Sequence, residues 1–263
     1  MNGNNENELK VQSSGANPLV IKISKLSTYL SQDLFGGPRK IRMSAMVNLH
    51  KFLSAFVVAA LMICYTNYSI GAWIYLCLHG SYGFIWVMKH FAFRDSRWEV
   101  GVTYSGAFVT FLILASYWIA PFLLLSGASG TISPASDIRI SSFAILFFVM
   151  GLAIMLASDA QKHFSLKAKK ELITTGMFKY IRHPNYLGEM MIYASFAIIS
   201  RHWISWIVLI FWWTSVFLIN MKMIESSLSR YKEWKDYKSR TGMLFPRIRK
   251  TIPYPPSLSI GKK

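Results

Sequence analysis

Apolar residues gather along this chain into long runs that are separated by short polar connections. A helix needs about 20 apolar residues to cross the hydrocarbon core of a bilayer, and six runs reach or approach that length. The sequence therefore predicts an all-α fold, a polytopic membrane helix bundle with about six transmembrane helices. We place these helices at residues 52–70, 71–88, 103–124, 141–158, 185–200 and 203–221.

The composition agrees with a membrane location. Hydrophobic residues make up 53% of the 263 positions and aromatic residues 15%, whereas only 16% are charged. A soluble domain of this length is less apolar and more highly charged. We therefore expect an integral, multi-pass membrane protein, in the endoplasmic reticulum membrane if the source is a eukaryote and in the inner membrane if it is a bacterium.

Basic residues are concentrated on one side of the predicted bundle, and the formal net charge is +17. They crowd the N-terminal segment, the second and fourth connections and the C-terminal tail, whereas the first connection, around residues 66–70, has none. The positive-inside bias places both termini in the cytosol and assigns Lys51 and Lys89 to cytosolic flanks. Membrane lipids are the partner that this charge implies. A nucleic acid is not expected, because the basic residues flank the spans and form no single stripe.

Four segments follow from the pattern. Residues 1–45 form a polar N-terminal tail, partly disordered, in which scattered apolar residues indicate either an interfacial helix or an unstructured tail. Residues 46–157 hold the N-terminal transmembrane helices, and residues 158–246 contain the polar motifs. Residues 247–263 form a Pro-rich C-terminal tail. We expect no metal site, because the two cysteines lie in apolar runs without metal-ligand spacing.

The most polar stretch next to an apolar run is residues 176–189, GMFKYIRHPNYLGE. A charge at such a membrane boundary costs a few kcal/mol, so it indicates a functional site. Pro184 suits a first helical turn, and on a helix that starts near His183 one sector of roughly 100° holds four polar side chains. These are Arg182, Asn185, Tyr186 and Glu189. His183 and Gly188 point elsewhere. In the alternative, Arg182 reaches lipid headgroups and Glu189 pairs with a neighbouring helix.

Two further polar groups accompany this motif. Gln161 and Lys162 close the fourth span and precede more lysines, which can bind phosphate groups as point charges. Glu225 follows the last span, and after it aromatic residues at 231, 234 and 237 recur at helical spacing. That pattern predicts an amphipathic helix on the cytosolic face that includes Tyr237 and Arg240 and caps a cofactor pocket.

The stretch from about Ser158 to Pro246 resembles the C-terminal catalytic domain of the steroid 5α-reductase type, including bacterial and protist proteins of unassigned substrate. It is similar to the Δ14-sterol reductases, and more distantly to isoprenylcysteine and phospholipid methyltransferases. The shared pattern Arg-His-x-Asn-Tyr-x-Gly-acidic is met at Arg182, His183, Asn185, Tyr186, Gly188 and Glu189. The resemblance implies a cofactor near the cytosolic face. The cofactor-binding residues that we expect are Gln161, Lys162, Arg182, His183, Asn185, Tyr186, Glu189, Glu225, Tyr237 and Arg240.

Two cofactors are compatible with this resemblance. The Arg-His-Pro-x-Tyr core is also typical of methyltransferases that bind S-adenosylmethionine. Asn185 and Glu189 favour NADPH, as does Glu225, which stands alone where the prenylcysteine enzymes have adjacent acidic residues. The lysines also suit a cofactor rich in phosphate better than a sulfonium.

The resulting prediction is a membrane-embedded, NADPH-dependent oxidoreductase. It reduces a carbon–carbon double bond in a lipophilic, steroid- or lipid-like small molecule that enters from the bilayer, with Tyr186 or Glu189 as the catalytic residue. The alternatives are an S-adenosylmethionine-dependent methyltransferase of a prenylcysteine or phospholipid, and a non-catalytic membrane protein. His79 and Tyr82 in the second span could also donate a proton, or merely bridge helices.

Overall fold

The computed structural model describes residues 17–128 and 138–247 and consists almost entirely of helices. The all-α prediction is therefore confirmed. The predicted Pro-rich tail after residue 247 and the polar residues before 17 lie outside the described residues. The helices of the bundle are α3 (Met43–Cys64), α4 (Ile70–Phe93), α5 (Tyr104–Ala115), α6 (Ile119–Leu125), α7 (Ile138–Ala168), α8 (Pro184–Ser200), α9 (Trp203–Trp212) and α10 (Leu218–Leu228).

Short elements connect these helices or lie at the ends of the bundle. A 3-10 turn, η3 (Ser116–Trp118), joins α5 to α6, and a π turn, η6 (Trp213–Phe217), joins α9 to α10. The remaining elements are α2 (Pro18–Thr28), η1 (Tyr29–Asp33), β1 (Ile41–Arg42), η2 (Ser96–Trp98), β2 (Gly101–Val102), η5 (Gly176–Phe178) and α11 (Trp234–Arg240).

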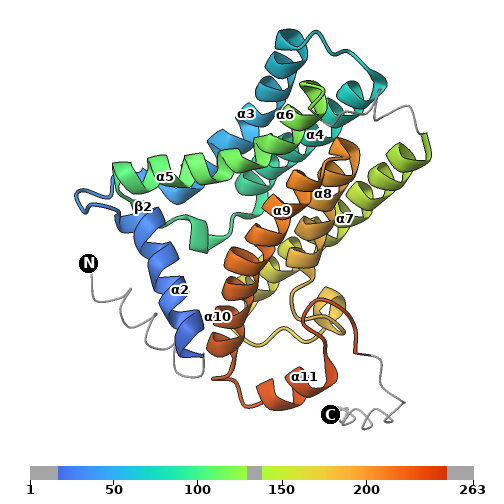
Figure 1. Cartoon of the computed structure of the whole chain (residues 1–263). Coiled ribbons are helices and arrows are strands. Elements are labelled where there is room, and N and C mark those ends of the chain that lie inside the picture. Colours follow the sequence, from blue (N-terminus) through green and yellow to red (C-terminus); the bar gives the residue numbers. More distant parts are fainter. Residues whose placement is uncertain (1–16, 129–137, 248–263) are drawn as a thin grey trace.

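Five helical stretches in the described residues are long and apolar enough to cross a membrane. They are Met43–Cys64, Ile70–Phe93, Tyr104–Leu125, Ile138–Ala168 and Trp203–Leu228. The fifth predicted span, residues 185–200, corresponds to α8, which has 17 residues and buries most of them between other helices. The predicted bundle of about six helices thus consists of five long helical stretches and one shorter, enclosed helix (Figure 1).

Several predicted boundaries were wrong. The first span ends at Cys64, so residues 65–69 form the connection to α4. Both α4 and α7 extend further than their apolar runs, to Phe93 and Ala168. Charged residues beyond the predicted ends are accommodated because Lys89 of α4 and Asp159 of α7 pair with each other inside the bundle. Gln161 and Lys162 therefore lie on α7 and not beyond its end.

The closest helix packing joins α7 to α8 through two glycines. A Cβ atom added to Gly188 would lie 2.5 Å from the carbonyl oxygen of Gly151, and one added to Gly151 would lie 2.7 Å from that of Gly188. Small residues let helix backbones approach in this way in membrane proteins. The contact fixes the position of α8, and with it the polar motif at the start of that helix.

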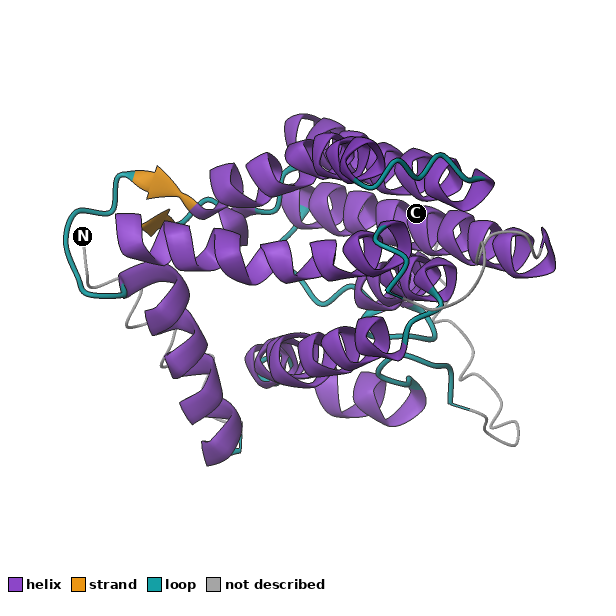
Figure 2. Cartoon of the chain, turned by 45° about the horizontal axis from the view of Figure 1, so that its top comes forward, coloured by secondary structure: helices purple, strands orange, loops and turns teal. Residues whose placement is uncertain are grey.

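The described part of the N-terminal segment is helical from Pro18 to Asp33, in agreement with the helical one of the two alternatives. The helix α2 packs through Val20 against Ile219 and Met223 of α10, while Leu19 and Leu26 remain exposed. Figure 2 shows the two short strands beside this region. They pair antiparallel, with Ile41 opposite Val102, and so tie the segment before α3 to the α4–α5 connection.

At the end of the bundle where α7 finishes and α8 begins, two distant segments are joined by backbone contacts. Ile181 forms a parallel bridge with Gly242, and the amide groups of Arg182 and His183 donate to the carbonyl oxygens of Gly242 and Met243, over 2.9 and 3.1 Å. The start of α8 is thus held by the chain that follows α11. Figure 1 shows α11 at this end of the molecule.

A methyl group at the glycine contact should destabilise the protein. For Gly188→Ala we expect the free energy of unfolding to fall by about 1–3 kcal/mol, because the new atom must displace the α7 backbone. Gly80→Ala is the matched control, since its Cβ would lie 3.4 Å from that of Ala55, an ordinary contact. Thermal unfolding in detergent measures both; equal midpoints for the two variants would contradict the packing described.

Candidate functional site

Three charged residues meet where α7 approaches the α4–α5 connection. The Lys162 ammonium and the Arg97 guanidinium each lie 2.8 Å from the same oxygen of Asp95. Burial alone raises the pKa of Asp95, but Arg97 and Lys162 outweigh it and hold the pKa of this carboxyl below its ordinary range. Two cations therefore share one carboxylate, which leaves one positive charge in excess. We call these three residues the cation cluster.

Gln161 shapes the loop beside this cluster. Its side-chain amide donates to the carbonyl oxygen of Thr175 and accepts from the amide of Met177, both over 2.9 Å. Gly176 between them has φ +57°, and a Cβ there would lie 2.5 Å from the Gln161 side chain. The side-chain nitrogen and oxygen of Gln161 are thus both engaged in holding the loop, and a contact with a cofactor would use these same two atoms.

Tyr186 and Glu189 lie on α8 between the cation cluster and the interior of the bundle. The Tyr186 hydroxyl interacts electrostatically with Arg97, and its ring packs edge-on against Phe217. Glu189 is half-buried and interacts at longer range with Lys51, Lys89 and Arg97. Its carboxylate makes no hydrogen bond to any residue in the described ranges. The two predicted catalytic residues are therefore brought to one place, with a free carboxylate between cations.

Arg182 has a different environment from the one that we expected. It precedes α8, and its Nε donates to Glu225 over 2.7 Å, while another of its nitrogens donates to the carbonyl oxygen of Thr241. Both side chains are buried, at 4% and 7% exposure. The expectation that His183 points away was wrong, since its Nε2 lies 3.6 Å from the same Glu225 oxygen. Lys238 completes this group at 3.2 Å from the other oxygen.

The remaining predicted residues lie around this ion-paired group. Tyr237 is buried and donates to the carbonyl oxygen of Phe178 over 2.7 Å. Burial raises the pKa of Tyr237 to about 12. Arg240 is exposed and pairs with Asp236 at 3.3 Å, and Asn185 is half-buried. The structure thus separates the predicted site into two groups: Lys162, Tyr186 and Glu189 near the cation cluster, and Arg182, His183, Glu225 and Tyr237 in a paired network at the base of α8.

Sequence reasoning missed several charged residues of the interior. Lys51 and Lys89 are enclosed by other helices and are not exposed flanking charges, because they are only 3% and 7% exposed. Lys89 forms an ion pair with Asp159, and its ammonium lies 4.4 Å from the centre of the Trp86 ring. The sequence did contain a signal for the buried Lys89. Trp86 lies one helical turn before it at the edge of an apolar run, and an aromatic ring can stabilise an ammonium group. Within the described ranges, no three His, Cys, Asp or Glu residues are grouped to hold a metal ion.

Residues 87–241 match the protein family described as "Protein of unknown function (DUF1295)", which is related to steroid 5α-reductase-like proteins. The chain belongs to this family. The matched range contains the cation cluster, all of α8 and Glu225. Lys51 lies outside it.

Curated relatives come from Schizosaccharomyces pombe. A protein named "Putative enoyl reductase" is 30% identical over 199 residues, which cover 66% of this chain and 63% of that protein. Two proteins named as uncharacterized are 43% identical over 56 residues (21% of this chain, 19% of that protein) and 29% identical over 131 residues (39% and 38%). The chain thus matches less than two thirds of each relative's length. These matches support a reductase-like family. No solved structure matches.

The buried pair at the base of α8 should be sensitive to the loss of one partner. We expect Arg182→Ala to lower the free energy of unfolding by about 3–5 kcal/mol, because Glu225 then remains charged and buried without its closest partner. Arg240→Ala, on an exposed ion pair, is the control and should change stability by less than about 1 kcal/mol. Both are measured by unfolding in detergent without cofactor, and a stable Arg182→Ala protein would refute the structural role.

Protonation of His183 should also affect stability. Burial lowers the pKa of His183 from 6.5, and Glu225 offsets part of this effect while Arg182 and Arg97 add to it. Below pH 6.5, His183 is protonated in the unfolded chain but stays neutral in the folded protein until the pH reaches its lower folded-state pKa. The free energy of unfolding therefore falls as the pH decreases over this range. Unfolding midpoints across this range should depend less on pH in His183→Gln. Identical slopes in both proteins would show that His183 is not the titrating group.

Proposed function

We propose that this protein is a membrane-embedded, NADPH-dependent reductase of a double bond in a lipophilic substrate. The observation that carries the proposal is the cation cluster, in which Lys162 and Arg97 share Asp95 and Arg97 also interacts with Tyr186. A bound NADPH supplies hydride, and the protein's contribution is to hold the cofactor, orient the substrate and exclude water.

The charge balance of the cluster favours a phosphate-bearing ligand. Lys162 and Arg97 have one carboxylate between them, and both retain access to solvent, with side chains 26% and 45% exposed. An ammonium and a guanidinium bind phosphate oxygens through charge-assisted hydrogen bonds. S-adenosylmethionine has no phosphate and carries a positive sulfonium, which an excess of cations disfavours. This difference supports NADPH over the methyl-transfer alternative.

The surroundings of α8 support a reaction near its first two turns. Glu189 is half-buried and free of hydrogen bonds to the described residues, so it can accept one from a bound ligand. Tyr186 offers a hydroxyl one turn earlier, on the same face. The helix α8, which carries these groups, packs against α4, α6, α7 and α9, all parts of apolar helical stretches, which suits a substrate taken from the bilayer. The name of the enoyl reductase relative agrees with a reduction, and the substrate remains part of the proposal.

The direct test is equilibrium binding of NADPH to the full chain in detergent. We expect Lys162→Ala and Arg97→Ala each to weaken NADPH binding about tenfold or more, because each removes a charge-assisted hydrogen bond worth about 1.5–3 kcal/mol. Lys169→Ala is the matched control. It removes the same charge from an exposed ion pair with Glu171 and should change binding less than about twofold.

The same titration with S-adenosylmethionine separates the two cofactors. Selective binding of S-adenosylmethionine, or NADPH binding that both cluster variants leave unchanged, would overturn the proposal. Oxidation of NADPH with trans-2-hexadecenoyl-CoA or androst-4-ene-3,17-dione then tests the reduction itself. Unfolding midpoints of the variants without cofactor show whether a loss of binding reflects a loss of folding.

A further inference from the structure

Helix α2 lies across one end of the bundle and joins two membrane-spanning stretches. Its Val20 side chain is buried against Ile219 and Met223 of α10. At the other end, the η1 turn that follows α2 is attached to α5, because the amide of Thr103 donates to the carbonyl oxygen of Gln32 over 2.9 Å. The helix therefore bridges the last part of one membrane-spanning stretch and the start of another.

These two helix ends lie on the same side of the membrane. Asp95, in the connection before α5, pairs with Lys162 near the end of α7. Arg182, just before α8, pairs with Glu225 near the end of α10. Since α7 ends and α8 begins on one side, α5 starts and α10 ends there too. The 11 residues of α2 cover about 16 Å, too short to cross a bilayer, so the helix runs along the membrane surface between these ends (Figure 1).

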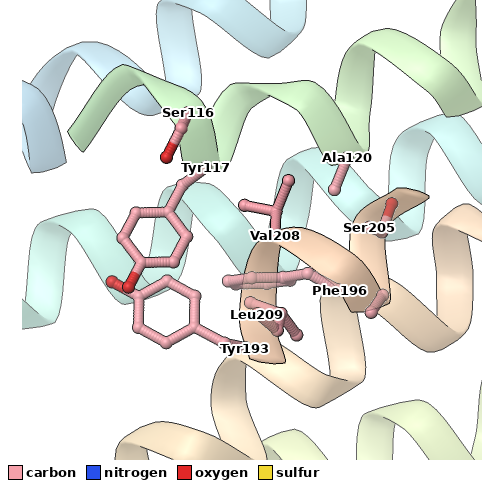
Figure 3. Close-up of a pocket in the computed structure, with 9 residues that line it drawn as sticks. Ser116, Tyr117, Ala120, Tyr193, Phe196, Ser205, Val208 and Leu209 are labelled. Carbon is pink, nitrogen blue, oxygen red and sulfur yellow. The ribbon is translucent and has the colours of Figure 1, made fainter. Parts of the chain in front are cut away.

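The apolar side chains of α2 are much less covered than those of the bundle interior. Figure 3 shows the interior between η3, α8 and α9, where the Tyr117 and Tyr193 rings lie side by side. Their centres are 4.1 Å apart, and the cavity beside them measures about 10 Å³, room for about one water molecule. In contrast, Leu19 and Leu26 of α2 are 64% and 57% exposed. The helix thus presents apolar surface that the described residues leave uncovered.

The exposed side of α2 combines apolar and basic side chains. At about 100° per residue, Leu19, Ile23 and Leu26 fall within a sector of roughly 60°. Lys22 and Lys25 lie along one edge of that sector, and both are exposed. The helix has no acidic residue. Helices that lie in a membrane interface have this composition, because their apolar side chains enter the acyl boundary while the lysines extend to phosphate groups.

The loop after η1 holds one aromatic ring away from the protein. Phe35 is 85% exposed and has φ +58°, a backbone conformation that is unfavourable for a bulky residue. The loop is closed by the Gly36 amide, which donates to the carbonyl oxygen of Asp33 over 2.8 Å, and by an ion pair of Asp33 with Arg39. Figure 2 shows this loop, between α2 and the strands, projecting away from the bundle. A strained backbone that exposes an apolar ring indicates a partner outside the protein.

We propose that α2 and the Phe35 loop bind anionic phospholipids at the surface of the bilayer. Leu19, Leu26 and Phe35 enter the boundary between headgroups and acyl chains, and Lys22 and Lys25 bind the phosphate groups. This inference goes beyond the proposed function and does not depend on it.

The position of α2 favours a lipid over a soluble partner. The helix lies beside the ends of two membrane-spanning stretches, at the level where headgroups surround the protein. A soluble acidic protein could pair with the lysines, but it would leave the leucines and the exposed ring without an apolar environment. A phospholipid supplies both, since its phosphate and its acyl chains lie within one molecule.

Spin labels test how deep these side chains lie. The full chain with Cys64→Ser and Cys77→Ser, which removes both native cysteines, is placed in nanodiscs of equal parts phosphatidylcholine and phosphatidylserine. A nitroxide is attached at Leu26→Cys, Phe35→Cys or Lys25→Cys. We expect the labels at Leu26 and Phe35 to be more accessible to oxygen than to a water-soluble nickel chelate. The label at Lys25 is the matched control and should show the reverse, because Lys25 is exposed next to Leu26 but lies on the lysine side of the helix.

Hydrogen–deuterium exchange tests the preference for anionic lipid. Val20 is the one buried side chain of α2, so the helix opens readily unless lipid holds it. We expect its amides to exchange about tenfold or more slowly in the phosphatidylserine mixture than in phosphatidylcholine alone, because two lysines act at the anionic surface. Lys22→Gln with Lys25→Gln should lose this difference. Lys232→Gln with Lys235→Gln is the matched control, since it changes two exposed lysines at the same spacing, and it should retain the difference.

Several results would overturn the inference. Equal access of nickel to the labels at Leu26 and Lys25 would show that the leucine lies in water. Exchange of α2 that is the same in both lipid mixtures would exclude a preference for anionic lipid. Protection only in nanodiscs with two copies of the chain would make this face a contact between copies. Equal protection by soluble glycerophosphoserine or polyglutamate in detergent would show that an anion suffices without a bilayer. Unfolding midpoints of the variants in detergent, which should match the wild type, separate these outcomes from misfolding.

Discussion

The structure depends on the pairing of cations inside an apolar helix bundle. Lysine side chains of α3, α4 and α7 and the arginine before α8 do not all extend toward lipid headgroups. Several of them are enclosed and stabilised by a few acids and aromatic rings. Lys89 with Asp159, Lys162 with Asp95 and Arg182 with Glu225 each join segments far apart in the sequence. Because an unpaired buried charge is strongly destabilising, these pairs help to determine how the helices are arranged.

Much of the fold could be predicted from the sequence, because long apolar runs have few alternatives to membrane helices. The positions of the helix ends could not be predicted in this way. Hydropathy places an end at the first charged residue, yet α4 continues beyond Lys89 and α7 beyond Asp159, since these two side chains pair with each other inside the protein. The enclosed position of α8 also depended on a tertiary feature, the approach of Gly188 to Gly151.

The candidate site was predicted in part. The motif at the start of α8 was found because polar residues at a membrane boundary are unusual. Lys162 was found from its position next to Gln161 at the end of a predicted span and from the resemblance of this stretch to reductases. Asp95 and its partner Arg97 were missed because Asp95 pairs with Lys162 across 67 positions, and no local pattern shows this contact. Arg182 was predicted to contact the cofactor, and this contact stays a prediction. In the structure, Arg182 donates to Glu225 and to the carbonyl oxygen of Thr241.

The central claim is that the cation cluster binds the phosphate groups of a nucleotide beside α8. An experimental structure of the full chain in detergent with NADPH tests it most directly. The account predicts phosphate density in contact with Lys162 and Arg97, and the nicotinamide end of the cofactor on the face of α8 that carries Glu189. Density elsewhere on the protein, with Lys162 and Arg97 still paired only to Asp95, would contradict the account.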